Sequence, residues 1–139
     1  MDNLEKYNHW EDISQYDMDT AEAMFQSGRY LYVVFMCQQS IEKLAKGLFV
    51  LYKGSEAPRT HNINFVLRPL FEEEEPLHSN VLSFSDKFEP FFAELLAYYI
   101  SERYPSYREK LTKAVSQEKA KEVLTQSKEA FVWLQSLKK

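Results

Sequence analysis

The sequence predicts an all-α protein, an antiparallel up-and-down bundle of about four to six helices that forms one domain over residues 1–139. Three observations support this fold class. The chain holds three glycines and five prolines, too few for a turn-rich β protein. Apolar residues recur at steps of three and four over long stretches. No stretch shows the alternation of apolar and polar residues that is typical of a strand.

The stretch 30–52 is predicted to be the central helix of the bundle, because it lacks proline and carries a continuous apolar seam. Its first half is apolar on every side, which is typical of a buried helix. Lys53, Gly54 and Ser55 are predicted to end it. The seam consists of Tyr30, Val34, Cys37, Ile41, Leu44, Leu48 and Leu51.

The chain before the central helix is predicted to be loose over residues 1–9 and helical from Asp12, an N-cap residue. Ser27 and Gly28 end this first helix, so it should form an antiparallel hairpin with the central helix. Its predicted apolar side consists of Ile13, Tyr16, Thr20, Ala23 and Met24.

After the central helix, Thr60 is predicted to cap a short helix that Pro69 limits. The acidic run 72–75 is predicted to be solvated. A further helix should follow, and Pro90 either kinks it or lies in the first turn of the next one. The predicted buried residues of the short helix are Ile63, Val66, Leu67 and Leu70, and the further helix is predicted to run through Val81, Phe84 and Phe88.

The stretch 91–100 is predicted to be an aromatic-rich helix, which a loop over 103–108 ends. Ser116 is predicted to cap the last helix. Together with the long apolar hairpin, the aromatic segment exceeds what a small monomer hides, so we expect a homodimer. The predicted apolar stripe of the last helix consists of Ala120, Val123, Leu124, Phe131 and Leu134.

Composition excludes several functional classes. The formal net charge is −4, which argues against nucleic-acid binding by bulk charge. There is no glycine-rich phosphate loop and no Cys/His cluster, so we expect no cofactor and no metal.

The single Cys37 is expected to be a buried thiol. No apolar run is long enough to cross a bilayer, and the first 25 residues hold seven acidic side chains, so we expect a cytoplasmic protein without membrane contact.

Two segments are candidate sites. His61 at a helix start either acts as a base or donates a hydrogen bond to a phosphate, or it only hydrogen-bonds a neighbouring loop. The 103–108 loop either grips a phosphate and stacks on a base through Arg103, Tyr104 and Arg108, or is a plain connector. No residue is predicted to be catalytic.

The polar face of the central helix is the third element of the candidate site. It consists of Gln39, Glu42, Lys43 and Lys46. The face either carries an exposed Glu42–Lys46 pair or lines a groove in which Lys43 and Lys46 add charge. The candidate nucleotide-binding residues are therefore Arg103, Tyr104, Arg108, Lys43, Lys46 and His61.

Three segments resemble the HEPN domain family in order and spacing. The run 37–48, CQQSIEKLAKGL, is similar to its central helix. The run 58–63, PRTHNI, resembles its Thr-His-Asp-Leu segment, and 103–106, RYPS, resembles its Arg-Tyr-Pro-Asp loop. The resemblance implies a helical bundle, often dimeric, and in many prokaryotic members a small nucleotidyltransferase partner in a toxin–antitoxin-like module. Some members bind nucleotides and some are ribonucleases.

The ribonuclease members carry an arginine followed after four to six residues by a histidine, a spacing that this sequence lacks. We therefore expect a non-catalytic HEPN-like domain that binds a nucleotide, a nucleotidyltransferase partner, or both. The alternatives are a ribonuclease with a non-standard site and a purely structural dimerisation module.

Overall fold

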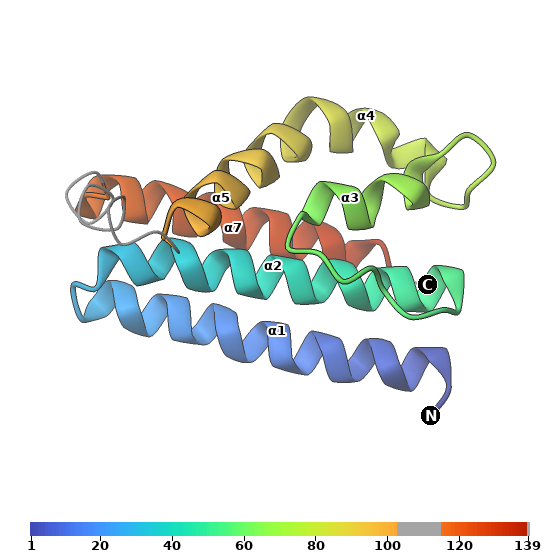
Figure 1. The fold of residues 1–139 in the computed structure, drawn as a ribbon, viewed down its shortest axis with the longest axis horizontal. Coiled ribbons are helices and arrows are strands. Elements are labelled where there is room, and N and C mark those ends of the chain that lie inside the picture. Colours follow the sequence, from blue (N-terminus) through green and yellow to red (C-terminus); the bar gives the residue numbers. More distant parts are fainter. Residues whose placement is uncertain (103–114, 139) are drawn as a thin grey trace.

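The computed structural model describes residues 1–102 and 115–138. In this part of the chain every regular element is helical, which confirms the predicted all-α class (Figure 1). The elements in chain order are α1 Asn3–Gln26, α2 Tyr30–Lys53, α3 Ile63–Leu67, η1 Arg68–Phe71, η2 His78–Asn80, α4 Val81–Ser83, η3 Phe84–Phe88, α5 Glu89–Glu102 and α7 Gln117–Ser136.

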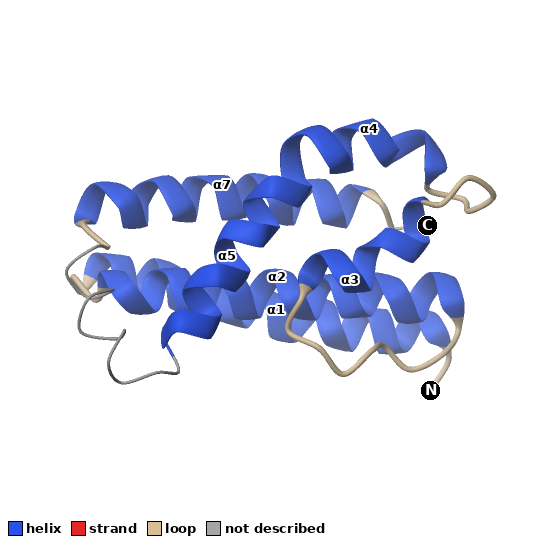
Figure 2. Ribbon diagram, turned by 45° about the horizontal axis from the view of Figure 1, so that its top comes forward, coloured by secondary structure: helices blue, strands red, loops and turns tan. Residues whose placement is uncertain are grey.

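Helix α2 is the centre of the bundle, as the sequence predicts. It contacts α1, α3, α5 and α7, and α5 crosses over it at an angle (Figure 2). The predicted seam is buried from Val34 to Leu51, and Tyr30 at its start is half-buried. The helix ends at Gly54, whose φ of 69° is a left-handed conformation that glycine adopts without strain. The predicted end of the central helix at 53–55 is confirmed, and Gly54 is the residue that caps it.

Helix α1 begins earlier than predicted, and Asp12 is not its cap. The carboxylate of Asp2 accepts a hydrogen bond from Glu5 N at 2.8 Å, and the helix starts at Asn3. Residues 3–9 are therefore helical instead of loose. Nothing in this stretch opposes a helix, because it contains neither glycine nor proline.

The predicted buried side of α1 is also wrong. Tyr16 is 74% exposed and Ala23 is exposed, while Ile13, Thr20 and Met24 are only half-buried. The face that packs on α2 contains polar residues that sequence periodicity alone does not assign to a core. It consists of Tyr7, Ser14, Asp17, Met18 and Ala21.

The short helix α3 has Asn62 as its cap instead of Thr60. The Asn62 side chain accepts from Phe65 N at 3.2 Å, while Thr60 Oγ1 accepts from Asn62 N at 3.1 Å. Two capping side chains in series shift the helix start by two residues. The predicted buried residues of α3 and η1 are all buried: Ile63, Val66, Leu67 and Leu70.

Pro90 lies in the first turn of α5, one of the two predicted positions. The preceding segment, η3, is a π-helical turn in which Glu89 N donates to Phe84 O. The chain thus passes from α4 through η3 into α5 without a break. The predicted helix through Val81, Phe84 and Phe88 is thus present, and within it Phe84 and Phe88 are buried while Val81 is half-buried.

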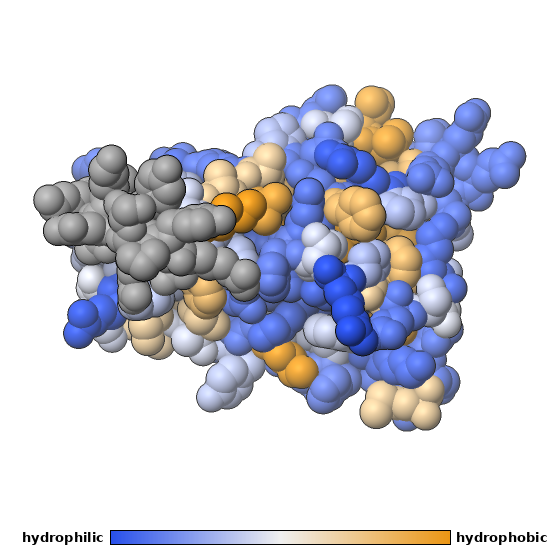
Figure 3. Space-filling view, in the orientation of Figure 1, coloured by the Kyte–Doolittle hydropathy of each residue, from blue (hydrophilic) through white to orange (hydrophobic). Residues whose placement is uncertain are grey.

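The aromatic side chains of α5 pack largely inside the molecule. Phe91, Phe92, Leu95 and Tyr99 are buried, while Ile100 is 48% exposed. On the face drawn in Figure 3, apolar side chains form small groups separated by hydrophilic ones. The premise that this segment exceeds what a monomer hides is therefore wrong for most of its residues.

Helix α7 closes the bundle against α2 and follows the prediction closely. The Ser116 hydroxyl accepts from Lys119 N at 3.1 Å and caps the helix. All five residues of the predicted stripe are buried.

Cys37 on α2 is also buried, as predicted, and burial raises the pKa of its thiol to about 12, so the thiol is a poor nucleophile.

Candidate functional site

His61 lies at the end of the loop that joins α2 to α3, and α2 holds it at two points. Its Nδ1 is 3.0 Å from Glu42 Oε1. Its backbone carbonyl accepts a hydrogen bond from Gln38 Nε2 at 2.7 Å. The imidazole is 44% exposed while the Glu42 side chain is 6% exposed, so a buried carboxylate orients a ring that reaches the surface.

Glu42 uses both of its carboxylate oxygens. Oε1 faces His61, and Oε2 accepts from Lys46 Nζ at 3.0 Å. A carboxylate can only accept hydrogen bonds, so Nδ1 of His61 carries the proton in this contact. Lys46 is 15% exposed and compensates the charge of Glu42, which makes the burial of this carboxylate tolerable.

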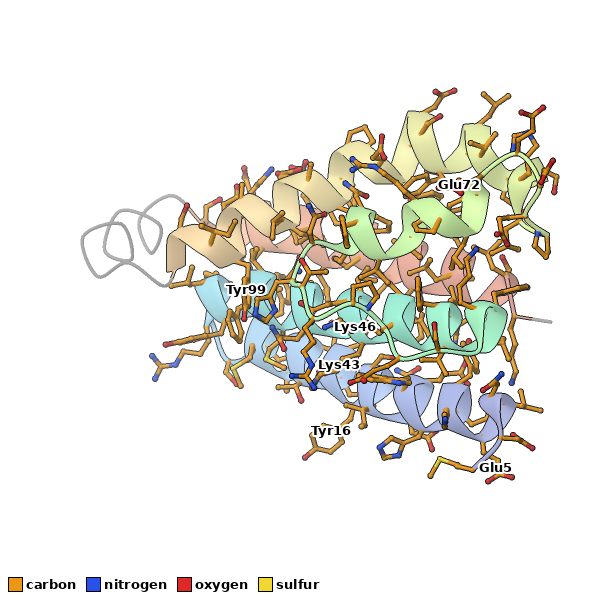
Figure 4. All side chains as sticks on the ribbon, turned by 45° about the vertical axis from the view of Figure 1, so that its right-hand side comes forward. Glu5, Tyr16, Lys43, Lys46, Glu72 and Tyr99 are labelled. Carbon is orange, nitrogen blue, oxygen red and sulfur yellow. The ribbon has the colours of Figure 1, made fainter. Side chains whose placement is uncertain are left out.

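Tyr99 of α5 forms the wall beside His61. The two rings have centroids 4.7 Å apart, and the Tyr99 hydroxyl is 3.5 Å from His61 Nε2. The Tyr99 ring also stacks on Phe35, with the ring centroids 5.2 Å apart. We call this cluster the His61 site, and it consists of Gln38, Glu42, Lys46, His61 and Tyr99. Figure 4 labels two of its members, Lys46 on α2 and Tyr99 on α5.

Lys43 lies on the neighbouring side of α2 and points toward α1, where its Nζ forms an ion pair with the Asp17 carboxylate. The Lys43 side chain is 27% exposed and that of Asp17 is 10% exposed. Because each lysine of the predicted polar face has a carboxylate partner, this face adds little net positive charge to the surface.

The structure brings two of the predicted site residues together and directs a third, Lys43, toward Asp17 of α1. Lys46 and His61 share Glu42, and Lys43 follows Glu42 on α2. The Glu42–Lys46 pair forms, but it is largely buried, so the expectation of an exposed pair is corrected. The remaining candidates, Arg103, Tyr104 and Arg108, lie outside the described residues.

The sequence analysis missed three contributors to the site: Gln38, Tyr99, and Glu42 as the partner of His61. A signal for two of them was present. Gln38, Glu42 and Lys46 follow one another at steps of four, which places a polar stripe along an otherwise apolar helix. Such a stripe predicts a polar partner from another segment, because buried polar groups need one.

The arrangement fits binding or proton transfer at the imidazole more than metal chemistry. A histidine oriented by a buried carboxylate can donate a hydrogen bond, exchange a proton, or carry positive charge toward an anion. Within residues 1–102 and 115–138, no three His, Cys, Asp or Glu side chains gather closely enough to hold a metal ion. None of the helices in this part is long and apolar enough to span a bilayer.

Fold and site together define a helical-bundle protein whose polar site lies between the central helix, the loop after it and the end of α5. A family model described as the HEPN domain matches residues 7–137. The chain belongs to the HEPN domain family. The comparisons with curated proteins and with solved structures found no match.

Proposed function

We propose that this HEPN domain binds the phosphate of a nucleotide at the His61 site and does not cleave RNA. The supporting observation is that the first two segments of the family resemblance, 37–48 and 58–63, meet there. Glu42 and Lys46 belong to the first segment and His61 to the second. Tyr99 of α5 packs beside His61 at a ring-centroid distance of 4.7 Å.

The chemistry of the site supports an anionic ligand of modest affinity. The imidazole is fixed by Glu42 and by the Gln38 contact to its backbone, so little freedom is lost when a ligand binds. Lys43 and Lys46 are compensated by carboxylates, so they add only a small attraction. The proposal therefore assigns most of the phosphate contact to His61 and to Arg103 and Arg108.

Calorimetric titration with ATP tests this function. We expect wild type to bind at about millimolar ligand or below, with affinity that falls as salt rises. Since a hydrogen bond to a charged group contributes about 1.5–3 kcal/mol, His61→Ala should weaken binding by roughly tenfold or more. The double variant Arg103→Ala, Arg108→Ala should show a loss of similar or greater size.

A matched control is Lys87→Ala, because Lys87 pairs with Glu129 of α7 on another part of the surface. Its affinity for ATP should equal that of wild type. Equal affinity in wild type and the His61→Ala variant, or no binding by wild type at millimolar ATP, would count against the site.

A protein partner is the second part of the proposal. We expect the chain to associate with a small nucleotidyltransferase, which co-purification and mass analysis of any bound protein would detect. A ligand recovered without a partner would favour the nucleotide alone. A partner recovered from a protein that binds no nucleotide would favour the protein interaction.

We also expect a homodimer in solution. The support that remains is a set of exposed large apolar side chains, Leu82 at 70% and Val132 at 63% among them. Light scattering at micromolar concentration should give twice the mass of the chain. A monomer mass over the same concentration range would contradict this expectation.

A ribonuclease is the second candidate function, because the Glu42–His61 contact is an oriented acid–base pair. We nevertheless expect no RNA cleavage above background in the presence of a chelator. The arginine–histidine spacing of the ribonuclease members is absent, and one imidazole supplies only one of the two proton transfers that cleavage needs.

The assay is incubation of single-stranded RNA with wild type and with His61→Ala at equal concentration. Cleavage by wild type that His61→Ala abolishes would replace the binding function with the catalytic one. Cleavage that both proteins show equally would indicate a contaminating nuclease.

A further inference from the structure

The contact between His61 and Glu42 determines where the imidazole carries its proton. Nδ1 of His61 lies 3.0 Å from Glu42 Oε1, and because a carboxylate only accepts hydrogen bonds, Nδ1 is a donor. Nε2 lies 3.5 Å from the hydroxyl of Tyr99, which can donate toward it. The neutral form of this ring therefore has a lone pair at Nε2. It can accept a hydrogen bond there but cannot donate one.

An ionised phosphate needs a donor at Nε2. Its oxygens carry negative charge and accept hydrogen bonds, so they are repelled by the lone pair of a neutral ring. Once Nε2 takes up a proton from solvent, both ring nitrogens are donors and the ring is a cation. Nδ1 then keeps its contact with Glu42, while Nε2 can donate a charge-assisted hydrogen bond to a phosphate oxygen.

The charged groups of α2 and α1 near His61 are paired with one another. Lys46 Nζ lies 3.0 Å from Glu42 Oε2, so the charge of this lysine is compensated by the carboxylate that also faces His61. Lys43 forms its ion pair with Asp17 of α1. Each pair sums to zero, so neither helix supplies net positive charge to a phosphate at the imidazole.

The loop and α5 do not change this balance. On the loop, Arg59 lies 3.8 Å from Glu56, and both side chains are largely exposed, so solvent screens this pair. From α5, Tyr99 contributes a hydroxyl beside Nε2. Within residues 1–102 and 115–138, the ion pairs around His61 thus cancel, and a proton at Nε2 is what gives the cluster a net positive charge.

We propose that the His61 site binds phosphate together with a proton, because the protonated imidazole binds phosphate in preference to the neutral ring. This inference rests on the proposed phosphate-binding function and adds its regulation by pH. Histidine side chains ordinarily change charge between about pH 5 and 8. Arg103 and Arg108 are charged throughout that range, so they add attraction without pH dependence. Since a proton is taken up on binding, affinity falls as pH rises.

Calorimetric titration with ATP at about pH 6.5, 7.5 and 9 tests the proton linkage in wild type and His61→Asn. Asparagine keeps an amide donor near the position of Nδ1, so Glu42 retains a partner, but it takes up no proton. Both proteins meet the same ATP, so the ratio of their affinities cancels the titration of the ATP phosphates. The matched control is His9→Asn, the same change at an exposed position of α1. Thermal unfolding verifies that both variants fold.

At about pH 6.5, wild type should bind ATP roughly tenfold or more tightly than His61→Asn, the effect of a hydrogen bond to a charged group. At about pH 9 the two affinities should differ by less than about twofold, because the neutral ring has no proton to donate at Nε2. Titrations at about pH 7.5 in two buffers of different ionisation enthalpy should show greater proton uptake by wild type than by His61→Asn. His9→Asn should match wild type at every pH.

Each other outcome overturns a defined statement. A ratio of wild-type to His61→Asn affinity that stays constant over the three pH values overturns the proton linkage and leaves the phosphate site intact. Equal proton uptake by the two proteins also overturns it, because the proton then binds elsewhere. The same holds if His9→Asn removes the pH dependence. If wild type binds no ATP at any of these pH values, the proposed phosphate-binding function fails, and this inference fails with it.

Discussion

The substitution Leu44→Ala should lower the free energy of unfolding by about 2–5 kcal/mol, the range measured for large-to-small changes in cores. Leu44 lies in the middle of α2 and is 0% exposed. Helix α2 contacts helices on several sides, so the neighbouring side chains cannot all move inward to fill the space. Urea denaturation followed by circular dichroism at the helical signal measures the effect.

A matched control is Leu82→Ala, which makes the same chemical change at a side chain that is 70% exposed. Its free energy of unfolding should differ from wild type by less than about 0.5 kcal/mol. A loss under about 1 kcal/mol for Leu44→Ala would mean that the seam of α2 is not the core of the bundle.

The substitution Gly47→Ala should also destabilise the protein, although alanine is the better helix former. A Cβ at position 47 would lie 2.8 Å from Trp10 Cβ and 3.3 Å from Tyr7 Cδ2. The nearer atom is close to the backbone of α1, so the whole helix must move away. Overpacking of this kind costs about 1–3 kcal/mol, which outweighs the roughly 1 kcal/mol that alanine gains over glycine in a helix.

A change from alanine to glycine at an exposed helix position measures the effect of helix propensity on stability without a change in packing. Ala97 is exposed on α5, and Ala97→Gly should lose about 1 kcal/mol from propensity alone. If Gly47→Ala instead stabilises the protein by a similar amount, the close approach of α1 to α2 does not exist in solution. Denaturant unfolding of both variants decides between these results.

The turn of the hairpin and the core of α2 were determined by the sequence, because both rest on local rules. An apolar seam at steps of three and four selects the buried side of a helix when that side is wholly apolar. The cap at Gly54 and the cap at Ser116 depend only on residues within one turn. The buried face of α1 failed this rule, since Ser14 and Asp17 lie inside.

The burial of Asp17 depends on a partner on α2 that is distant in the chain, whereas the Ser14 hydroxyl donates to the Glu11 carbonyl within α1 at 2.9 Å. Ser40 Oγ donates to the Ser14 carbonyl at 2.7 Å, and Lys43 pairs with Asp17. Hydrophobicity scales assign such residues to the surface, whereas a satisfied hydrogen bond or ion pair permits burial. No periodicity within α1 carries that information.

For the candidate site, the sequence by itself selected His61, Lys43 and Lys46, since a histidine at a helix start and lysines one turn apart are local signals. Only the tertiary structure decided that Glu42 orients His61, that Tyr99 stands beside it, and that both lysines are compensated. The physical reason is that electrostatic interactions depend on distances of a few ångströms between segments far apart in sequence. Residue spacing determines the distances between side chains of one helix. The distances between side chains of α2, the 54–62 loop and α5 depend on how the bundle packs.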